Sequence, residues 1–140
     1  MVRSILAVLF GVIAGAFLVF LSERVSHMLF PIPAGFDPTK PGAIAALPFG
    51  AKAAVVIAWF AGAFGGGSLA SLIARRWAPA VWVVAATILL FAMTNFSAFP
   101  HPLWMVVASA PAVGLGGYFA VRLTGARYGR PPVAEKKSFP

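Results

Sequence analysis

Residues 53–74 read AAVVIAWFAGAFGGGSLASLIA and are followed at once by Arg75 and Arg76. The run carries no charged residue, and as a helix it is long enough to cross the roughly 30 Å hydrocarbon core of a bilayer. Three further runs have the same character, at residues 5–21, 78–93 and 102–121. None of them alternates apolar and polar residues with a period of two, so we predict helices rather than the strands of a barrel.

The composition of the whole chain also indicates that lipid, rather than water, surrounds most of the protein. Of the 140 residues, 61% are hydrophobic and 10% are charged, and the mean hydropathy is +0.92. A soluble domain is about 45–50% apolar and about 25% charged. We therefore predict an all-α, polytopic membrane protein built as one four-transmembrane-helix bundle. The chain contains no cysteine, which excludes disulfides, thiolate metal ligands and a cysteine nucleophile.

The apolar runs and the residues between them define the expected boundaries. A transmembrane domain at residues 1–126 is expected to hold spans at about 4–27, 50–75, 78–98 and 102–124, with an outer loop at 28–49 and a basic cytoplasmic tail at 127–140. We interpret the first run as a retained span, because it is too long for a signal peptide and ends in Ser22-Glu23-Arg24 rather than in a small-residue cleavage site.

The outer loop is rich in proline, which favours extended and turn backbone. Within it, residues 42–47 can form one helical turn. The apolar side chains of Phe30, Ile32 and Phe36 suggest that the loop lies on the membrane surface.

Lysine and arginine residues set the expected orientation, because they concentrate on the cytoplasmic side of membrane proteins. With the N-terminus inside, that side holds Arg3, Arg75, Arg76, Arg122, Arg127, Arg130, Lys136 and Lys137, and the outer side holds Arg24, Lys40 and Lys52. We therefore expect both termini in the cytoplasm, and we expect the cytoplasmic residues from Arg75 onwards to contact anionic lipid headgroups. In a soluble chain the net charge of +8 would suggest nucleic acid. Here the basic residues flank apolar runs, so no nucleic-acid partner is expected.

Within residues 53–74, Gly65-x-Gly67-x-x-Ala70 fits the pattern of a dinucleotide-binding turn. That turn needs a strand before the glycines and an acidic residue about 20 positions after them. The sequence around position 90 reads ILLFAM instead, so we reject a cofactor site.

Small residues at every fourth position favour helix packing instead. They are Ala58, Gly62, Gly66, Ala70 and Ala74 in the second span and Ala7, Gly11 and Gly15 in the first, with Gly114, Gly116 and Gly117 in the fourth. Such residues let helix backbones approach closely in lipid, where van der Waals contact drives association. We predict that Gly11, Gly15, Gly62, Gly66, Ala70, Gly116 and Gly117 bring spans one, two and four together. A partner's helix or a lipid tail in the same groove is the alternative.

The glycine pattern also recurs along the chain. Gly66-Gly67-x-x-Ala70 in the second span matches Gly116-Gly117-x-x-Ala120 in the fourth. Either small-residue contacts or a duplication of helical hairpins would produce this echo.

Few side chains can carry chemistry, and several of them fall at the outer ends of the spans. Glu23 and His27 are four residues apart and so share one side of a helix, and His101 lies in the turn between the third and fourth spans. These three can form a metal site, a proton-sensing or proton-relay group, or a hydrogen-bonded cluster that joins the first helix to the last outer turn. The specific His-Glu-x-x-His spacing is missing, which favours the hydrogen-bonded cluster.

The sequence lacks the motifs of common enzymes. No serine lies in a Gly-x-Ser-x-Gly setting and no phosphate loop is present. The hydroxyl groups inside the spans can bond to the backbone of their own helices; they belong to Ser68, Ser71, Thr87 and Ser109.

We therefore predict a non-catalytic protein without a cofactor, an accessory or structural subunit that packs against other membrane helices in a larger complex. The alternative is an oligomeric small transporter or channel, in which Glu23, Thr94 and Asn95 would line a shared water cavity. The third possibility is a metal-dependent or proton-sensing site on the outer face.

The chain also carries Glu23-x-x-x-His27, Pro31-x-Pro33-x-x-x-Asp37-Pro38, the glycine-rich span that ends in arginine, and Pro100-His101-Pro102-x-Trp104. With these motifs it resembles a group of short bacterial four-span membrane proteins, over nearly the whole chain except the tail. The resemblance implies a location in the bacterial inner (plasma) membrane and supports a polar group on the outer face. It implies no reaction.

Overall fold

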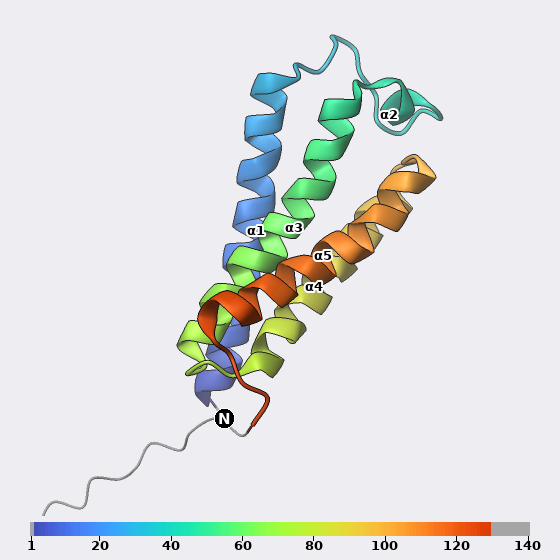
Figure 1. Cartoon of the computed structure of the whole chain (residues 1–140). Helices are drawn as coiled ribbons and strands as arrows, with labels where there is room; N and C mark the ends of the chain where they lie inside the picture. Colours follow the sequence, from blue (N-terminus) through green and yellow to red (C-terminus); the bar gives the residue numbers. More distant parts are fainter. Residues whose placement is uncertain (1, 130–140) are drawn as a thin grey trace, which may run out of the picture.

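The computed structural model describes residues 2–129, and within them the regular structure is helical (Figure 1). The elements are α1 (Val2–Leu29), α2 (Ala43–Ala46), α3 (Phe49–Ile73), α4 (Ala78–Ala98) and α5 (Leu103–Thr124). All four helices other than α2 are long and apolar enough to cross a membrane. The protein is therefore an all-α membrane protein with a four-helix bundle, as the sequence predicted.

Local backbone chemistry explains where the helices begin and end. Pro48 and Pro102 have extended backbone and directly precede α3 and α5, a position where the missing N–H of proline costs nothing. Gly125 ends α5 with a φ of 62°, in the left-handed region that glycine adopts without a steric penalty. α3 stops at Ile73, before the predicted residue 75, and Arg75 and Arg76 after it have φ values of 56° and 61°.

α3 is the central helix, and it contacts α1, α4 and α5. Figure 1 shows α1 beside α3 and α4 beside α5, with the two pairs separating towards the end that carries α2. We call this the α2 end, and we call the opposite end, where α1 begins and α5 ends, the N-terminal end. Between the pairs lies a core that includes the fully buried side chains of Val81, Val84, Ile88 and Met105.

Small residues make the contact between α1 and α3. A Cβ atom added at Gly11 would lie 2.8 Å from the carbonyl oxygen of Gly66 and 2.8 Å from the Cβ of Ala70. A Cβ added at Gly15 would lie 2.8 Å from the carbonyl oxygen of Gly62. These distances leave no room for a side chain, so the two helix backbones touch directly.

Gly116 and Gly117 bring α5 close to two different neighbours. A Cβ added at Gly116 would lie 2.6 Å from the carbonyl oxygen of Phe60 in α3, and one added at Gly117 would lie 3.1 Å from the Trp82 ring in α4. Gly114 has no atom within 4 Å of an added Cβ, so the prediction that it joins the helix contact is wrong.

The repeated glycine motif does not make repeated contacts. Gly66 faces α1, the preceding long helix in the chain, whereas Gly116 faces α3 rather than α4. The equivalent positions of the two hairpins therefore have different neighbours, and the duplication stays a prediction.

The hydroxyl groups inside the bundle are satisfied in different ways. Thr87 and Ser109 donate to backbone carbonyl oxygens one turn earlier in their own helices, at 2.9 and 2.8 Å. Ser71 instead forms a 2.8 Å hydrogen bond with the Thr124 hydroxyl, which joins α3 to α5. Within residues 2–129, the buried oxygen of Ser68 has no hydrogen-bond partner, so the backbone bond expected for it is not formed.

Candidate functional site

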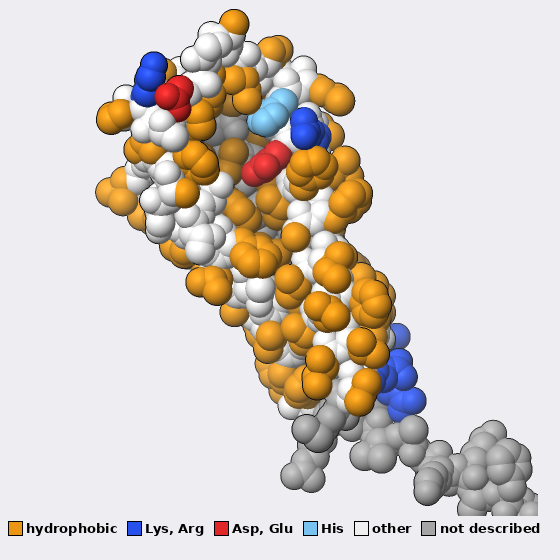
Figure 2. Space-filling model, turned by 180° about the vertical axis from the view of Figure 1, so that it is seen from behind, with side chains coloured by type: hydrophobic (Ala, Val, Ile, Leu, Met, Phe, Trp, Pro, Cys, Tyr) orange, Lys and Arg blue, Asp and Glu red, His pale blue; other side chains and the backbone are white. Residues whose placement is uncertain are grey.

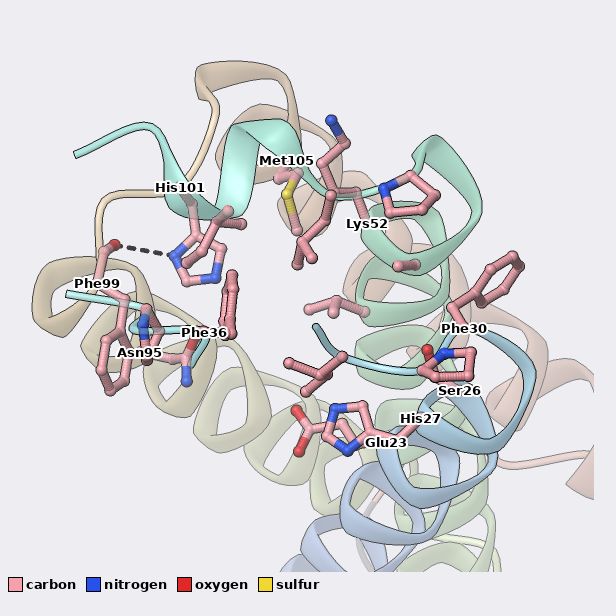
Figure 3. Close-up of a pocket in the computed structure, with 18 residues that line it drawn as sticks. Glu23, Ser26, His27, Phe30, Phe36, Lys52, Asn95, Phe99, His101 and Met105 are labelled. Carbon is pink, nitrogen blue, oxygen red and sulfur yellow. Dashed lines mark hydrogen bonds between the residues drawn. The ribbon is translucent and has the colours of Figure 1, made fainter. Parts of the chain in front are cut away.

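A cavity of about 200 Å³ lies at the α2 end of the bundle. Its lining comes from α1, the loop that follows α1, the start of α3, the end of α4 and the start of α5 (Figure 3). Figure 2 shows a hollow near this end, with acidic, basic and histidine side chains at its rim. An apolar cavity of roughly 150 Å³ can hold a benzene ring, so this cavity is large enough for a small organic group.

The loop at residues 30–48 covers the cavity, and its own chemistry fixes its path. The Asp37 carboxylate accepts hydrogen bonds from the hydroxyl and the backbone N–H of Thr39, at 2.6 and 3.0 Å. The hydroxyl contributes most to holding the pKa of Asp37 below its usual value. Lys52 reaches back from α3, and its Nζ donates to the carbonyl oxygen of Ala45 at 2.6 Å. The helical turn expected at residues 42–47 is α2.

Two aromatic side chains of the loop line the cavity. The Phe30 ring lies so close to Gly50 of α3 that an added Cβ there would overlap the ring. Phe30 and Phe36 both line the cavity. Both side chains are half-buried, whereas Ile32 is 43% exposed. That the loop lies on the membrane surface stays a prediction.

The structure brings Glu23, His27 and His101 to this one cavity. Glu23 and His27 lie together on α1, as their spacing predicted, and His101 lies across the cavity from them (Figure 3). Glu23 interacts electrostatically with His27 and with Arg24. The Arg24 guanidinium lies 4.9 Å from the centre of the Phe20 ring, which draws it towards that ring.

His101 is held in place by two contacts. Its Nδ1 lies 2.9 Å from the carbonyl oxygen of Phe99, and its ring packs edge-on against Phe96 with 4.9 Å between the centroids. Because a carbonyl oxygen can only accept, Nδ1 carries the proton of this hydrogen bond. In the neutral imidazole the other nitrogen, Nε2, is then an acceptor.

The three-ligand metal site that the sequence allowed is not formed. Among residues 2–129, no three histidine, aspartate or glutamate side chains are placed so that they could hold one metal ion. The physical reason is that the α1 pair and His101 occupy opposite walls of the cavity (Figure 3). His101 bonds to Phe99 within its own turn, so it does not join α1 to that turn as the hydrogen-bonded cluster required. A proton-sensing role stays a prediction.

Asn95 lines the same cavity, within a single copy of the chain. Thr94, which the transporter alternative placed beside it, donates its hydroxyl to the carbonyl oxygen of Phe91 at 2.8 Å. Sequence reasoning did not assign Ser26, Lys52 or Met105 to the site. Ser26 follows Glu23 by three residues, a helical spacing that could have found it. Met105 has no such signal, because its position depends on how α5 packs.

The basic residues expected to contact headgroups lie largely at the N-terminal end. Arg127 joins the turn between α3 and α4, where its N–H donates to the carbonyl oxygen of Arg76 and its own carbonyl oxygen accepts from the N–H of Ala78, both at 2.8 Å. The tail predicted from residue 127 therefore begins in contact with the bundle. The side chains of Arg75, Arg76, Arg122 and Arg127 are exposed, whereas Arg130, Lys136 and Lys137 lie outside the described residues.

No family model, curated protein or solved structure matches the chain. The resemblance to short bacterial four-span proteins and the inner-membrane location therefore stay predictions, and the function has to be argued from the cavity.

Proposed function

We propose that the protein is a non-catalytic membrane protein that binds a small ammonium-bearing ligand in the cavity at the α2 end. The observation that carries this proposal is that Glu23 and the aromatic residues Phe30, Phe36 and Phe99 line one cavity, with the Phe36 ring turned into it (Figure 3). A carboxylate forms a strong charge-assisted contact with an ammonium group, and the faces of aromatic rings attract the same cation.

The other polar groups of the cavity favour a ligand that donates hydrogen bonds. Lys52 directs its ammonium group to the Ala45 carbonyl oxygen, so this cation points towards the loop. His101 donates its Nδ1 proton to Phe99, which leaves Nε2 as an acceptor. The Asn95 amide adds a further oxygen that can accept.

The proposed orientation puts the cavity at a membrane boundary. Arg3 and Glu23 are twenty positions apart in α1, which corresponds to about 30 Å, the thickness of the hydrocarbon core. We propose the bacterial inner membrane, with the N-terminal end in the cytoplasm because the basic residues concentrate there. The cavity then opens on the outer side, where both water and lipid reach it.

Ligand binding is compatible with the accessory-subunit role predicted from the sequence. We favour ligand binding without transport over transport of the ligand through a single copy of the chain. A transported ligand would have to pass the N-terminal half of the bundle. There the helix backbones touch at Gly66 and at Gly116, which supports a closed half. The four apolar helices alone are compatible with either role.

The test uses butylammonium and butyrate as probes of opposite charge, with ligand-observed NMR on the purified protein in maltoside micelles. We expect saturable binding of the ammonium probe, and Glu23→Gln should weaken it about tenfold or more, because a hydrogen bond or contact to a charged group contributes about 1.5–3 kcal/mol. Asp37→Asn is the matched control, since it removes a nearby acid that is bound to Thr39 and is not among the lining residues. Tighter binding of butyrate, or unchanged binding by Glu23→Gln, would refute the proposal.

A further inference from the structure

We propose that the N-terminal end of the bundle is a folded binding surface for the phosphate groups of anionic phospholipids. The sequence predicts contact between basic residues and headgroups in general terms. The fold adds a fixed arrangement of arginines, which makes specific binding possible. This surface is separate from the cavity at the α2 end and does not depend on what the cavity binds.

Five exposed arginines gather at this end, and they come from four segments of the chain. They are Arg3, Arg75, Arg76, Arg122 and Arg127. Arg3 lies in the first turn of α1, and its Nε donates to the carbonyl oxygen of Ile73, the last residue of α3. Among residues 2–129 the only carboxylates belong to Glu23 and Asp37, which lie towards the α2 end. Figure 2 shows the same separation of basic and acidic side chains on the face in view, so this end attracts anions.

Hydrogen bonds join the turn between α3 and α4 to the segment that follows α5. The N–H of Arg76 donates to the carbonyl oxygen of Ser71 at 2.7 Å, and the N–H of Arg127 donates to the carbonyl oxygen of Arg76 at 2.8 Å. Nearby, Nε1 of Trp82 donates to the Tyr128 hydroxyl at 3.0 Å. The backbones of Arg76 and Arg127 are therefore held beside each other.

Arg76 has a backbone conformation that arginine rarely adopts. Its φ is 61°, and the preceding Arg75 has a φ of 56°, both in the left-handed region where a Cβ atom is crowded. Glycine is the usual residue where a helix ends in this conformation. Strain of this kind is concentrated at functional sites, where the side chain has a use that offsets the cost. The conformation therefore favours a binding role for the arginine side chain at this turn.

The surroundings favour a phospholipid over a dissolved anion. Leu123 directly follows Arg122 and is 72% exposed, and Leu72 at the end of α3 is 57% exposed. Both belong to helices long and apolar enough to span the membrane, so these side chains contact acyl chains. Tryptophan and tyrosine concentrate at the level of the headgroups, where the pair of Trp82 and Tyr128 would lie. The planar guanidinium groups match the geometry of a phosphate.

The experiment is native mass spectrometry of the full chain in detergent micelles, titrated with dioleoylphosphatidylglycerol or dioleoylphosphatidylcholine. The two lipids share their acyl chains and differ in net charge. Arg76→Gly should weaken the binding of phosphatidylglycerol about fivefold, which is the usual contribution of one basic residue near an anionic membrane surface. Because glycine adopts a positive φ without a steric penalty, the same variant should unfold in sodium dodecyl sulfate no earlier than the unmodified protein. Phosphatidylcholine should bind more weakly than phosphatidylglycerol and should not respond to the substitution.

Three further variants make the outcomes distinct. Lys40→Gly removes the same charge from an exposed position of the loop and should leave the binding of phosphatidylglycerol unchanged. Arg122→Gln tests a second arginine of the surface and should give a loss similar to that of Arg76→Gly. Arg76→Lys keeps the charge but removes the planar guanidinium, so it should also weaken the binding.

Equal affinity for the two lipids, or unchanged binding of phosphatidylglycerol by both Arg76→Gly and Arg122→Gln, would overturn the inference. Full binding by Arg76→Lys would mean that diffuse attraction between charges is sufficient, and an equal loss in Lys40→Gly would mean the same; either result would overturn a folded site. Earlier unfolding of Arg76→Gly would assign the arginine to stability instead of binding. Displacement of the lipid by dissolved glycerol phosphate would assign the surface to a soluble anion.

Discussion

Replacing Gly66 by alanine tests whether backbone contact between α1 and α3 holds the bundle together. A Cβ atom at this position would lie 2.9 Å from the Cα of Gly15 and 3.0 Å from its nitrogen, and it would be closer still to the carbonyl oxygen of Gly11. All three atoms belong to the backbone of α1, so no side-chain rotation can relieve the overlap. Ordinary contact begins near 3.4 Å, so the helices must move apart by about 0.5–1 Å at this point.

The cost of that movement follows from the dispersion energy that it removes. A gap of about 0.5–1 Å forfeits a quarter to a half of the energy of an atom pair, and each pair contributes about 0.1–0.2 kcal/mol. If about 40 pairs across the contact open in this way, the loss is about 2 kcal/mol, or roughly a 30-fold fall in the folding equilibrium constant. In lipid there is little hydrophobic drive between helices to offset the loss.

Gly114→Ala is the matched control, because a Cβ there meets nothing within 4 Å. Both substitutions gain about 1 kcal/mol of helix propensity, so the difference between the two variants isolates the contact. The assay is reversible unfolding by sodium dodecyl sulfate in maltoside mixed micelles, followed by circular dichroism. We expect Gly66→Ala to be less stable than Gly114→Ala by about 2 kcal/mol. Equal stability of the two variants would refute the reasoning, because it would mean that α1 and α3 do not depend on their close approach.

Two further predictions concern a buried hydroxyl and the orientation in the membrane. Ser68→Ala removes a buried oxygen that has no hydrogen-bond partner within residues 2–129, so in the same titration it should be neutral or stabilising by about 1 kcal/mol. Ser71→Ala removes a bond between helices and should destabilise by about 1 kcal/mol; the opposite order would contradict this prediction. The chain has no cysteine, so single cysteines report topology. Thr39→Cys should react with a membrane-impermeant maleimide in intact cells and Gly129→Cys only after lysis, and the reverse pattern would overturn the proposed orientation.

The fold was predictable from the sequence because the lipid surroundings of the helices and the contacts between them both produce local sequence patterns. Uncharged apolar runs of sufficient length predict spans, and small residues at every fourth position predict which side of α3 meets α1. Spacing alone does not say which side of α5 is covered. Gly114 and Gly116 are two positions apart, which turns them about 200° from each other on the helix. Gly116 therefore faces α3 while Gly114 meets no neighbour.

The site was predictable only where it depends on a single helix. Glu23 and His27 share a side of α1 because of their spacing, and the structure places both at the cavity. The position of His101 depends on how α4 and α5 pack and on the bond from its ring to Phe99, which the sequence pattern does not determine. The same holds for Phe30, whose ring reaches Gly50 of another helix.

The residues that close one half of the bundle also explain why the other half is open. Near the N-terminal end, α3 and α5 meet through small residues, and a Cβ added at Gly67 would lie 3.3 Å from the Cβ of Ala120. Towards the α2 end, the buried residues of the same two helices include the larger Trp59 and Met105, with the small Ala58 beside Trp59. The distance between packed helices grows with the side chains at their contact, so the pairs diverge in that direction (Figure 1). The loop then covers a space that the helices cannot fill, and Glu23 reaches that space because it lies near the end of α1. The cavity thus lies beyond the close glycine and alanine contacts of the N-terminal half, at the end where the larger Trp59 and Met105 are buried.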